Sequence, residues 1–187
     1  MGNYHHKKEK DPRYNLPGIS GPILSDYFPD NHCTICLFGI EGVGKSSIFN
    51  RLTYNTFYDE YKSTLAPQTA KIQRIFKEEP LDIDLIDLSY YVQWMVVYAI
   101  DNKESLEQLK ERMDDISQAE DSYNKKYIKM LVGNKTDNYA FEQVIEDDVR
   151  KYAKNNRFGF TSICCKNNNN DAEFALEEIL QMFTYMY

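Results

Sequence analysis

The sequence is poor in cysteine, has no long apolar run and carries no basic stripe. Its 4 cysteines are too few for a disulfide scaffold, and no stretch resembles a signal peptide or a membrane-spanning helix, so we expect a cytoplasmic protein. A net charge of −7 argues against nucleic acid as a main partner and against attraction to an anionic membrane. The 187 residues suit one globular domain at 32–187, preceded by a flexible tail at 1–31 in which prolines are scattered.

Cys33 and Cys36 form a C-x-x-C pair in the linear sequence. Both lie in the apolar run from Cys33 to Phe38, which predicts a buried strand. Positions three apart on a strand point to opposite faces of a sheet, so we expect two packing residues rather than a shared metal.

Residues 39–46 fit the pattern G-x-x-x-x-G-K-[ST] of a phosphate-binding loop, between the predicted strand and a helix that runs to about Tyr54. Glycines let backbone N–H groups approach a phosphate, the helix N-terminus adds a positive dipole end, and Lys45 supplies a full charge. A glycine-rich turn that binds nothing is the alternative. The predicted phosphate-binding residues are Glu41, Gly42, Val43, Gly44, Lys45, Ser46 and Ser47.

A second set of residues is predicted to bind Mg²⁺. Ser46 offers a hydroxyl, Thr64 lies in the loop after the first helix, and Asp87 follows the predicted strand Leu81–Ile86. Two hydroxyls and one carboxylate suit a hard cation that retains waters. The sequence therefore predicts a magnesium site formed by Ser46, Thr64 and Asp87.

Asn134, Lys135 and Asp137 form an N-K-x-D loop after the predicted strand Ile128–Val132. Asp137 can accept hydrogen bonds from the ring N–H and the exocyclic amine of guanine. Adenine does not offer this arrangement, so a buried carboxylate would be left unpaired and discrimination should be large. The tetrapeptide alone is also compatible with a solvated polar turn, but its position downstream of a phosphate-loop lysine favours guanine recognition.

Strands and helices alternate along the chain. Further strands are expected at about 68–76, 95–100 and 158–163, and further helices at about 103–118, 142–154 and 171–185. This order predicts an α/β fold with a doubly wound, mostly parallel sheet of about six strands and helices on both faces. The second and third strands should form a hairpin, and the ligand should lie at the carboxyl ends of the strands.

The connection after Asp87 is predicted to be short and taut. The third and fourth strands flank the first and run parallel, so the chain must return along the sheet by a diagonal of roughly 22 Å. From Asp87 to Trp94 the backbone reaches at most about 24 Å, which leaves no room for the usual crossover helix. We therefore predict a missing crossover helix and a shortened fourth strand that begins near Trp94, or else a rearranged sheet.

From Cys33 to Phe183 the sequence resembles the Ras superfamily of small GTPases, and the Rab branch most of all. The resemblance rests on the phosphate loop, on Tyr61-Lys62-Ser63-Thr64, on the spacing from Thr64 to Asp87, on Val132-Gly133-Asn134-Lys135-Thr136-Asp137 and on Thr161-Ser162-Ile163. It implies a GTPase domain that binds GTP or GDP with Mg²⁺, with Phe57 covering the guanine and with Ser162 and Ile163 supporting the base loop. It also implies protein effectors and regulators as partners, an exchange factor among them.

The sequence departs from this family after Asp87. Residues 88–92 read LSYYV and lack both the glycine and the glutamine of the family's D-x-x-G-Q, so switch II is largely deleted and no catalytic residue is assigned. Glu41 stands where the family has a small residue beside the γ-phosphate. Its negative charge should repel the triphosphate end of GTP. In the segment 161–164, which corresponds to the family's second guanine-binding loop, Ile163 and Cys164 replace alanine and lysine. The positively charged side chain of that lysine is therefore absent.

Partner and membrane features of the family are also altered. Residues 64–69 lack the usual glycine and phenylalanine of the effector face, and Ile86 replaces a tryptophan, so particular effectors are not implied. No cysteine for prenylation stands at the C-terminus. Stable membrane anchoring is therefore not supported, and a peripheral location would require a partner.

Three interpretations remain open. The first is a Rab-like, GTP/GDP-dependent molecular switch in vesicle trafficking or signalling, with weak hydrolysis of GTP to GDP and phosphate. The second is a pseudo-GTPase that binds nucleotide without hydrolysing it and serves as an interaction module. The third is an incomplete chain that lacks part of an ordinary GTPase. Asp137 argues against an adenine-specific phosphotransferase.

Overall fold

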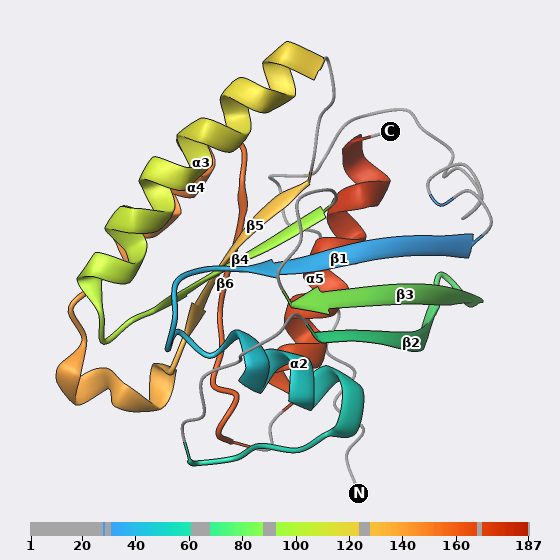
Figure 1. Cartoon of the computed structure of the whole chain (residues 1–187), viewed down its shortest axis with the longest axis horizontal. Coiled ribbons are helices and arrows are strands. Elements are labelled where there is room, and N and C mark those ends of the chain that lie inside the picture. Colours follow the sequence, from blue (N-terminus) through green and yellow to red (C-terminus); the bar gives the residue numbers. More distant parts are fainter. Residues whose placement is uncertain are drawn as a thin grey trace, which may run out of the picture.

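The computed structural model describes residue 28 and residues 31–60, 68–87, 93–123, 128–167 and 170–186 (Figure 1). In chain order the elements are β1 (His32–Phe38), α2 (Lys45–Tyr54), β2 (Gln68–Phe76), β3 (Glu79–Asp87), β4 (Gln93–Ala99), α3 (Lys103–Tyr123), β5 (Lys129–Asn134), the 3₁₀ helix η3 (Thr136–Phe141), α4 (Glu146–Asn155), β6 (Gly159–Ser162) and α5 (Asp171–Met186). The predicted alternation of strands and helices is confirmed.

The strands form one 6-stranded sheet in the order β2-β3-β1-β4-β5-β6. All neighbouring strands are parallel except β2 and β3, which form the predicted hairpin. Its two turn residues, Lys77 and Glu78, have φ of 49° and 69°. Positive φ at both central positions matches the twist of the flanking strands, so the turn holds the hairpin in register. The predicted α/β class and mostly parallel sheet are thus confirmed.

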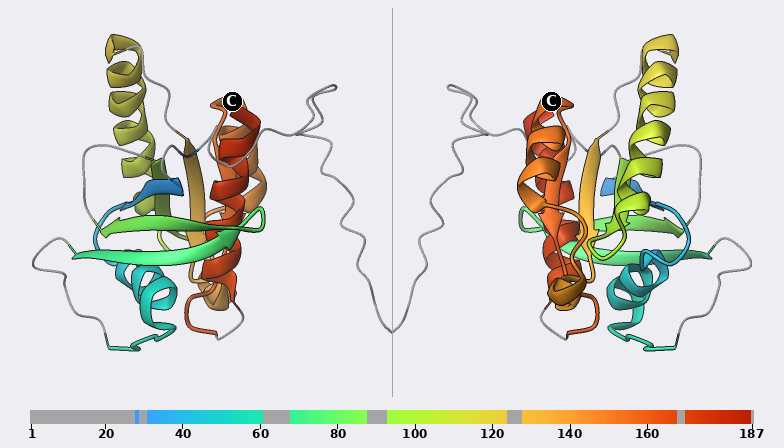
Figure 2. Two further views of the ribbon diagram at one scale, coloured as in Figure 1. Left: turned by 90° about the vertical axis from the view of Figure 1, so that its right-hand side faces the viewer. Right: turned by 90° about the vertical axis from the view of Figure 1, so that its left-hand side faces the viewer.

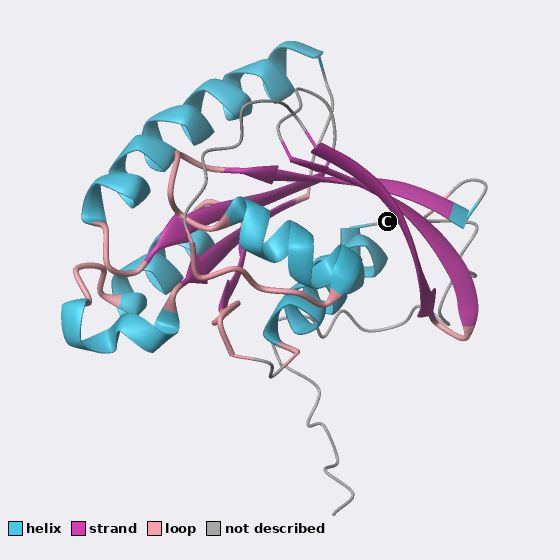
Figure 3. Cartoon of the chain, turned by 60° about the horizontal axis from the view of Figure 1, so that its bottom comes forward, coloured by secondary structure: helices cyan, strands magenta, loops and turns pink. Residues whose placement is uncertain are grey.

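Helices cover both faces of the sheet (Figures 2 and 3), with α3 and α5 on opposite sides. Apolar residues of α2 and α5 pack with Ile35 and Leu37 in one core cluster, and residues of α3 and α4 pack with Val96 and Leu131 in a second. Cys33 belongs to the first cluster and Cys36 to the second, so their predicted opposite orientation is confirmed. Among the described residues, no helix has the length and apolar character needed to cross a membrane.

The short connection from β3 to β4 is made possible by the register of the sheet. Asp87, the last residue of β3, is level with Leu37 of β1, and Gln93, the first of β4, is level with Ile35. The chain must therefore return only about 7 Å along the sheet and about 10 Å across it, a diagonal of about 12 Å. The backbone from residue 87 to residue 93 can reach about 21 Å.

The predicted start of the fourth strand near Trp94 is confirmed, and the sheet is not rearranged. The connection need not be taut, contrary to the prediction, because β4 is displaced towards the carboxyl end of β1. It pairs with Ile35–Phe38, which shortens the path from β3. The prediction assumed a return along a whole strand. The prediction that the crossover helix is missing applies to residues 88–92, which lie outside the described residues.

The face of the hairpin that lies on the α3 side of the sheet carries several paired polar side chains, together with the exposed Ile75 and the half-buried Ile86. His32 Nε2 and Asp84 Oδ2 lie 3.1 Å apart, Lys71 Nζ lies 3.8 Å from Asp84 Oδ1, and Gln73 Nε2 donates to Asp82 Oδ1 at 2.7 Å. Polar groups paired in this way can face water without the desolvation cost of buried charges. The stretch around Asp82 and Asp84 is therefore compatible with exposure to water.

Two predicted helix boundaries were wrong. The helix expected from Glu142 begins only at Glu146, because the backbone N–H groups of Gln143 and Val144 both donate to Ile100 O, at 2.8 and 3.2 Å. These bonds hold the segment against the end of β4 in a non-helical path. Helix α3 continues to Tyr123, beyond the expected end at Gln118.

Phe28 anchors the chain ahead of β1. Its side chain is 1% exposed, with ring centroids 4.6 Å from Phe183 and 6.2 Å from Phe76. The predicted boundary at residue 31 places Phe28 in the tail, whereas its ring is part of the core. Residues 1–27 and 29–30 lie outside the described residues, so the flexible tail stays a prediction.

Replacing Phe28 with alanine should lower the free energy of unfolding by about 3 kcal/mol, because it leaves a cavity between the β2–β3 hairpin and α5. Phe174, on α5 and 48% exposed, provides the matched control, and its change to alanine should cost less than about 1 kcal/mol. Urea denaturation of both variants checks this. Equal losses would show that Phe28 is not a core residue in solution.

Candidate functional site

The loop between β1 and α2 has a backbone that only glycine can adopt at its two ends. Gly44 has φ of 98°, and a Cβ there would lie 2.1 Å from Asn134 Nδ2. At Gly39 a Cβ would lie 2.3 Å from the backbone oxygen of Val97. Both distances are shorter than van der Waals contact, so the two glycines let the loop pack tightly against β4 and β5.

The amino end of α2 is positively polarised and has no acidic residue in its first turn. By contrast, α3, α4 and α5 each carry acidic residues there. Lys45, the first residue of α2, donates from Nζ to Ile40 O at 2.9 Å, which places its ammonium group over the loop. The helix dipole and the lysine together favour an anion at this position.

Asn134 joins the phosphate loop to the N-K-x-D loop. Its side chain is 2% exposed, and its Nδ2 donates to Val43 O at 2.9 Å. Its Oδ1 is buried and accepts no hydrogen bond from the described residues. A buried acceptor of this kind is costly unless a donor reaches it. The two loops, distant in the sequence, thus form one continuous surface.

Backbone bonds hold the base loop at the carboxyl ends of β5 and β6. Ile163, fully buried, donates its N–H to Gly133 O at 2.8 Å and accepts from the Thr136 N–H at 3.3 Å. Lys135, with φ of 69°, has its Nζ 3.6 Å from Asp101 Oδ1. Asp101 also accepts from Asn138 Nδ2 at 2.8 Å. Asp101 was not singled out from the sequence, since a lone aspartate after a strand carries no pattern.

Asp137 lies in the first turn of η3 and is exposed, so its discrimination against adenine would depend on the base that covers it. The thiol of Cys164 donates to its Oδ1 at 3.3 Å. The hydroxyl of Ser162 turns away and donates to Glu146 Oε2 at 3.1 Å. Ser162 therefore contacts α4, and Ile163 contacts the backbone of the N-K-x-D loop and of the residue before it. Neither of these described side chains donates a hydrogen bond to Asp137.

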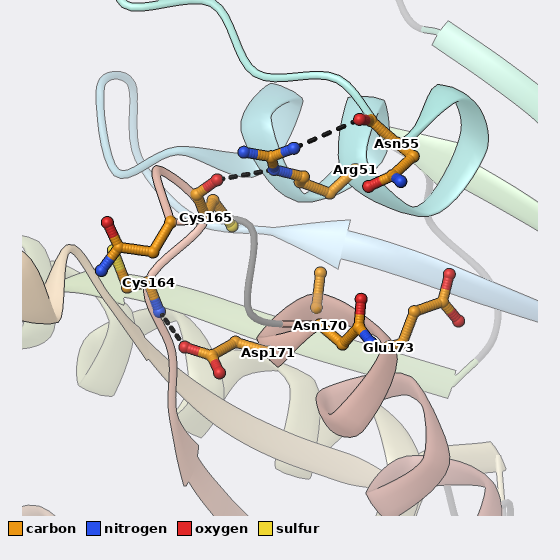
Figure 4. Close-up of a pocket in the computed structure, with 9 residues that line it drawn as sticks. Arg51, Asn55, Cys164, Cys165, Asn170, Asp171 and Glu173 are labelled. Carbon is orange, nitrogen blue, oxygen red and sulfur yellow. Dashed lines mark hydrogen bonds between the residues drawn. The ribbon is translucent and has the colours of Figure 1, made fainter.

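Arg51 connects the loop after β6, at Cys165 and Lys166, to the end of α2. Its Nε donates to Cys165 O at 2.7 Å, its Nη2 to Lys166 O at 3.0 Å and its Nη1 to Asn55 O at 3.2 Å. Its Cζ lies 5.7 Å from the ring centroid of half-buried Phe57. Figure 4 shows Arg51 above a small hollow that is also lined by Cys164, Cys165 and Asp171.

Arg51 could not be predicted from the sequence, because two of its three partners are backbone carbonyls more than a hundred residues away, and such contacts leave no sequence pattern.

The remaining predicted residues are placed as follows. Val43 is buried, Ser46 and Ser47 are half-buried in the first turn of α2, and Glu41 and Gly42 are exposed at the tip of the loop. Thr64 lies outside the described residues. Asp87 ends β3 beside Leu37 of β1, but its side chain is not described. The magnesium site therefore stays a prediction, with Ser46 at the expected edge of the sheet.

This arrangement defines a class of protein. A phosphate-binding loop with a lysine, at the carboxyl edge of a mostly parallel sheet and in contact with an N-K-x-D loop, is the architecture of P-loop proteins that bind nucleotides.

Comparison with known proteins identifies the family. Residues 34–184 match the model of the Ras family. The chain is 31% identical to the Ras-related protein RabC of Dictyostelium discoideum, over 72% of this chain and 76% of that protein. It is 26% identical to the GTP-binding protein drn-1 of Caenorhabditis elegans (79% and 76% covered) and 27% identical to the GTP-binding protein ypt3 of Schizosaccharomyces pombe (77% and 72% covered). The chain belongs to the Ras family and is Rab-like.

Replacing Arg51 with methionine should lower the free energy of unfolding by about 2 kcal/mol, because three carbonyl oxygens lose a charged donor. Arg157 is exposed and is the matched control, whose change to methionine should cost less than about 0.5 kcal/mol. Thermal unfolding monitored by circular dichroism measures both. An Arg51 variant as stable as the control would mean that the loop after β6 is held without this arginine.

Proposed function

We propose that this protein is a guanine-nucleotide-binding small GTPase that requires Mg²⁺ and hydrolyses GTP slowly. The observation that carries the proposal is the hydrogen bond from Asn134 to the Val43 carbonyl, which brings the phosphate loop and the base loop together. A ligand bound across both loops must offer phosphates at one end and a purine at the other. A guanine nucleotide meets both requirements.

The chain's own residues fit such a ligand. Backbone N–H groups of the loop from Glu41 to Ser47 and the ammonium of Lys45 would hold the phosphates. Mg²⁺, held by Ser46, Thr64 and Asp87, would neutralise phosphate charge. Asn134, Lys135 and Asp137 would bind the guanine, with Phe57 over it and with Ser162 and Ile163 behind the loop. The buried Asn134 Oδ1, the close approach at Gly44 and the first turn of α2 without an acid support this assignment.

The purified protein should bind GDP in the presence of Mg²⁺ and reject ADP, because Asp137 pairs with groups that adenine lacks. Lys45→Ala should abolish binding, since it removes the charge over the phosphates. Asp137→Asn should shift the preference towards xanthine nucleotides, which exchange a donor for an acceptor. Isothermal titration with each nucleotide measures these effects.

Lys151→Ala, an exposed lysine on α4, is the control for loss of a positive charge and should leave binding unchanged. Equal affinity of the unmodified protein for ATP and GTP would rule out guanine recognition.

Slow hydrolysis follows from what the chain lacks after β3. Phosphoryl transfer in this class depends on positioning the attacking water and on stabilising charge. Residues 88–92 supply no glutamine after Asp87. Glu41, exposed at the tip of the phosphate loop, adds negative charge where an activating arginine would approach. Binding depends on other residues and can persist.

Single-turnover hydrolysis of γ-labelled GTP should proceed at or below about 10⁻⁴ per second, with little stimulation by activating proteins. Glu41→Ala should improve the response to an activator more than the intrinsic rate, because no residue would yet align the water. Phosphate release more than about tenfold faster than that rate, without a partner, would show that another residue positions the water. Tyr90 and Gln93 would then be mutated first.

Two modes of action are compatible with slow hydrolysis. In the first, the protein is a GTP/GDP-dependent switch in vesicle trafficking or signalling, regulated by an exchange factor and read by effectors. In the second, it is a pseudo-GTPase that binds nucleotide and serves as an interaction module. Amide hydrogen exchange in the GDP-bound and GTP-bound protein separates them, since only a switch changes protection with the γ-phosphate.

An incomplete chain is the third interpretation. The paired polar side chains of His32, Asp82 and Asp84 on the α3 side of the sheet support a native deletion, since these groups can face water without a helix over them. The four free cysteines are compatible with a cytoplasmic location.

A further inference from the structure

We infer that Cys164 is a positioning residue for guanine recognition, whose thiol orients the carboxylate of Asp137 towards the base. The inference rests on the proposed function and goes beyond it, because it concerns how the protein distinguishes guanine from a purine that lacks the exocyclic amine. Its basis is the hydrogen bond from Cys164 Sγ to Asp137 Oδ1 at 3.3 Å.

The position of the thiol is fixed by the fold. Cys164 is 3% exposed, and its backbone N–H donates to Asp171 Oδ2 at 2.8 Å, as Figure 4 shows. Asp171 is the first residue of α5, so the loop after β6 is tied to a helix that packs on the core. Main chain and side chain of Cys164 are therefore both held, and the thiol can act as a fixed donor.

No other side chain in the described part of the chain donates a hydrogen bond to Asp137. Ser162, the last residue of β6, donates from its hydroxyl to Glu146 instead. The ammonium of Lys135 lies by Asp101 instead, at 3.6 Å. Because Asp137 is exposed, its carboxylate would otherwise rotate freely about its side-chain bonds. The orientation of this carboxylate thus depends on Cys164.

The thiol is in the protonated form that donation requires. Burial, and the hydrogen bond to Asp137 in addition, raise the pKa of Cys164 above the ordinary value for cysteine. At neutral pH the group therefore keeps its proton. A thiol is a weak donor, but the acceptor is charged, which strengthens the bond.

Orientation matters because guanine needs both oxygens of the carboxylate. The ring N–H and the exocyclic amine lie side by side, and each requires one oxygen in the plane of the base. Hypoxanthine has the ring N–H but no amine, so it uses one oxygen and tolerates a rotated carboxylate. Loss of the Cys164 donor should therefore weaken GDP binding more than binding of inosine diphosphate.

The test compares GDP and inosine diphosphate on the full chain with Mg²⁺, by equilibrium competition against a fluorescent guanine nucleotide. Cys164→Ala should weaken GDP binding about fivefold and inosine diphosphate binding less than about twofold. Cys164→Ser restores a donor, and its preference for GDP should be within about twofold of the unmodified protein. Cys164→Val, close in size to cysteine but without a donor, should behave like the alanine variant if alanine impairs folding.

Cys33→Ala is the control for loss of a buried thiol, since Cys33 lies in the core cluster away from the base loop. It should leave the ratio of GDP to inosine diphosphate affinity unchanged. An unchanged ratio in Cys164→Ala or Cys164→Val, or a fall in both affinities by the same factor, overturns the positioning role while guanine binding stands. Failure of the unmodified protein to bind GDP would overturn the proposed function and this inference with it.

Discussion

The contact between the Asn134 amide and the Val43 carbonyl is the constraint on which the candidate site depends. It brings the end of β5 against the loop between β1 and α2, and it does so at a point where Gly44 leaves no space for a side chain. Two chain segments of different chemistry, one suited to phosphates and one to a base, become a single surface. Around it, Arg51 and the backbone of Ile163 hold the loop after β6 to α2 and β5.

The register of the sheet makes a short connection between β3 and β4 possible. The displaced register of β4 shortens the path, and polar pairs such as Gln73 with Asp82 make part of one sheet face compatible with water. The base and phosphate loops lie outside this segment, since they follow β1, β5 and β6. The contact between the phosphate loop and the N-K-x-D loop is therefore present although residues 88–92 supply no glutamine.

Much of the fold was predictable, because it follows from local patterns. The apolar runs of β1, β4 and β5 and the hairpin of β2 and β3 have strong periodicity and turn residues, so their existence and order were correctly predicted. The helix expected at Glu142 was wrong because the helical pattern there is overridden by two hydrogen bonds to Ile100, a contact between distant segments. The taut connection expected after Asp87 is not required by the sheet, because register is a property of the whole sheet and could not be read from the sequence.

By itself the sequence determined the phosphate loop, the N-K-x-D loop and the family, since these depend on residue types at fixed spacings along the chain. Only the tertiary structure decided what supports them. Arg51 and Asp101 act through partners far away in the sequence, Ser162 turns towards Glu146, and Cys164 lies against Asp137. Spacing along a chain specifies which groups are available, but a hydrogen bond between loops depends on distances that the packing of helices on the sheet sets.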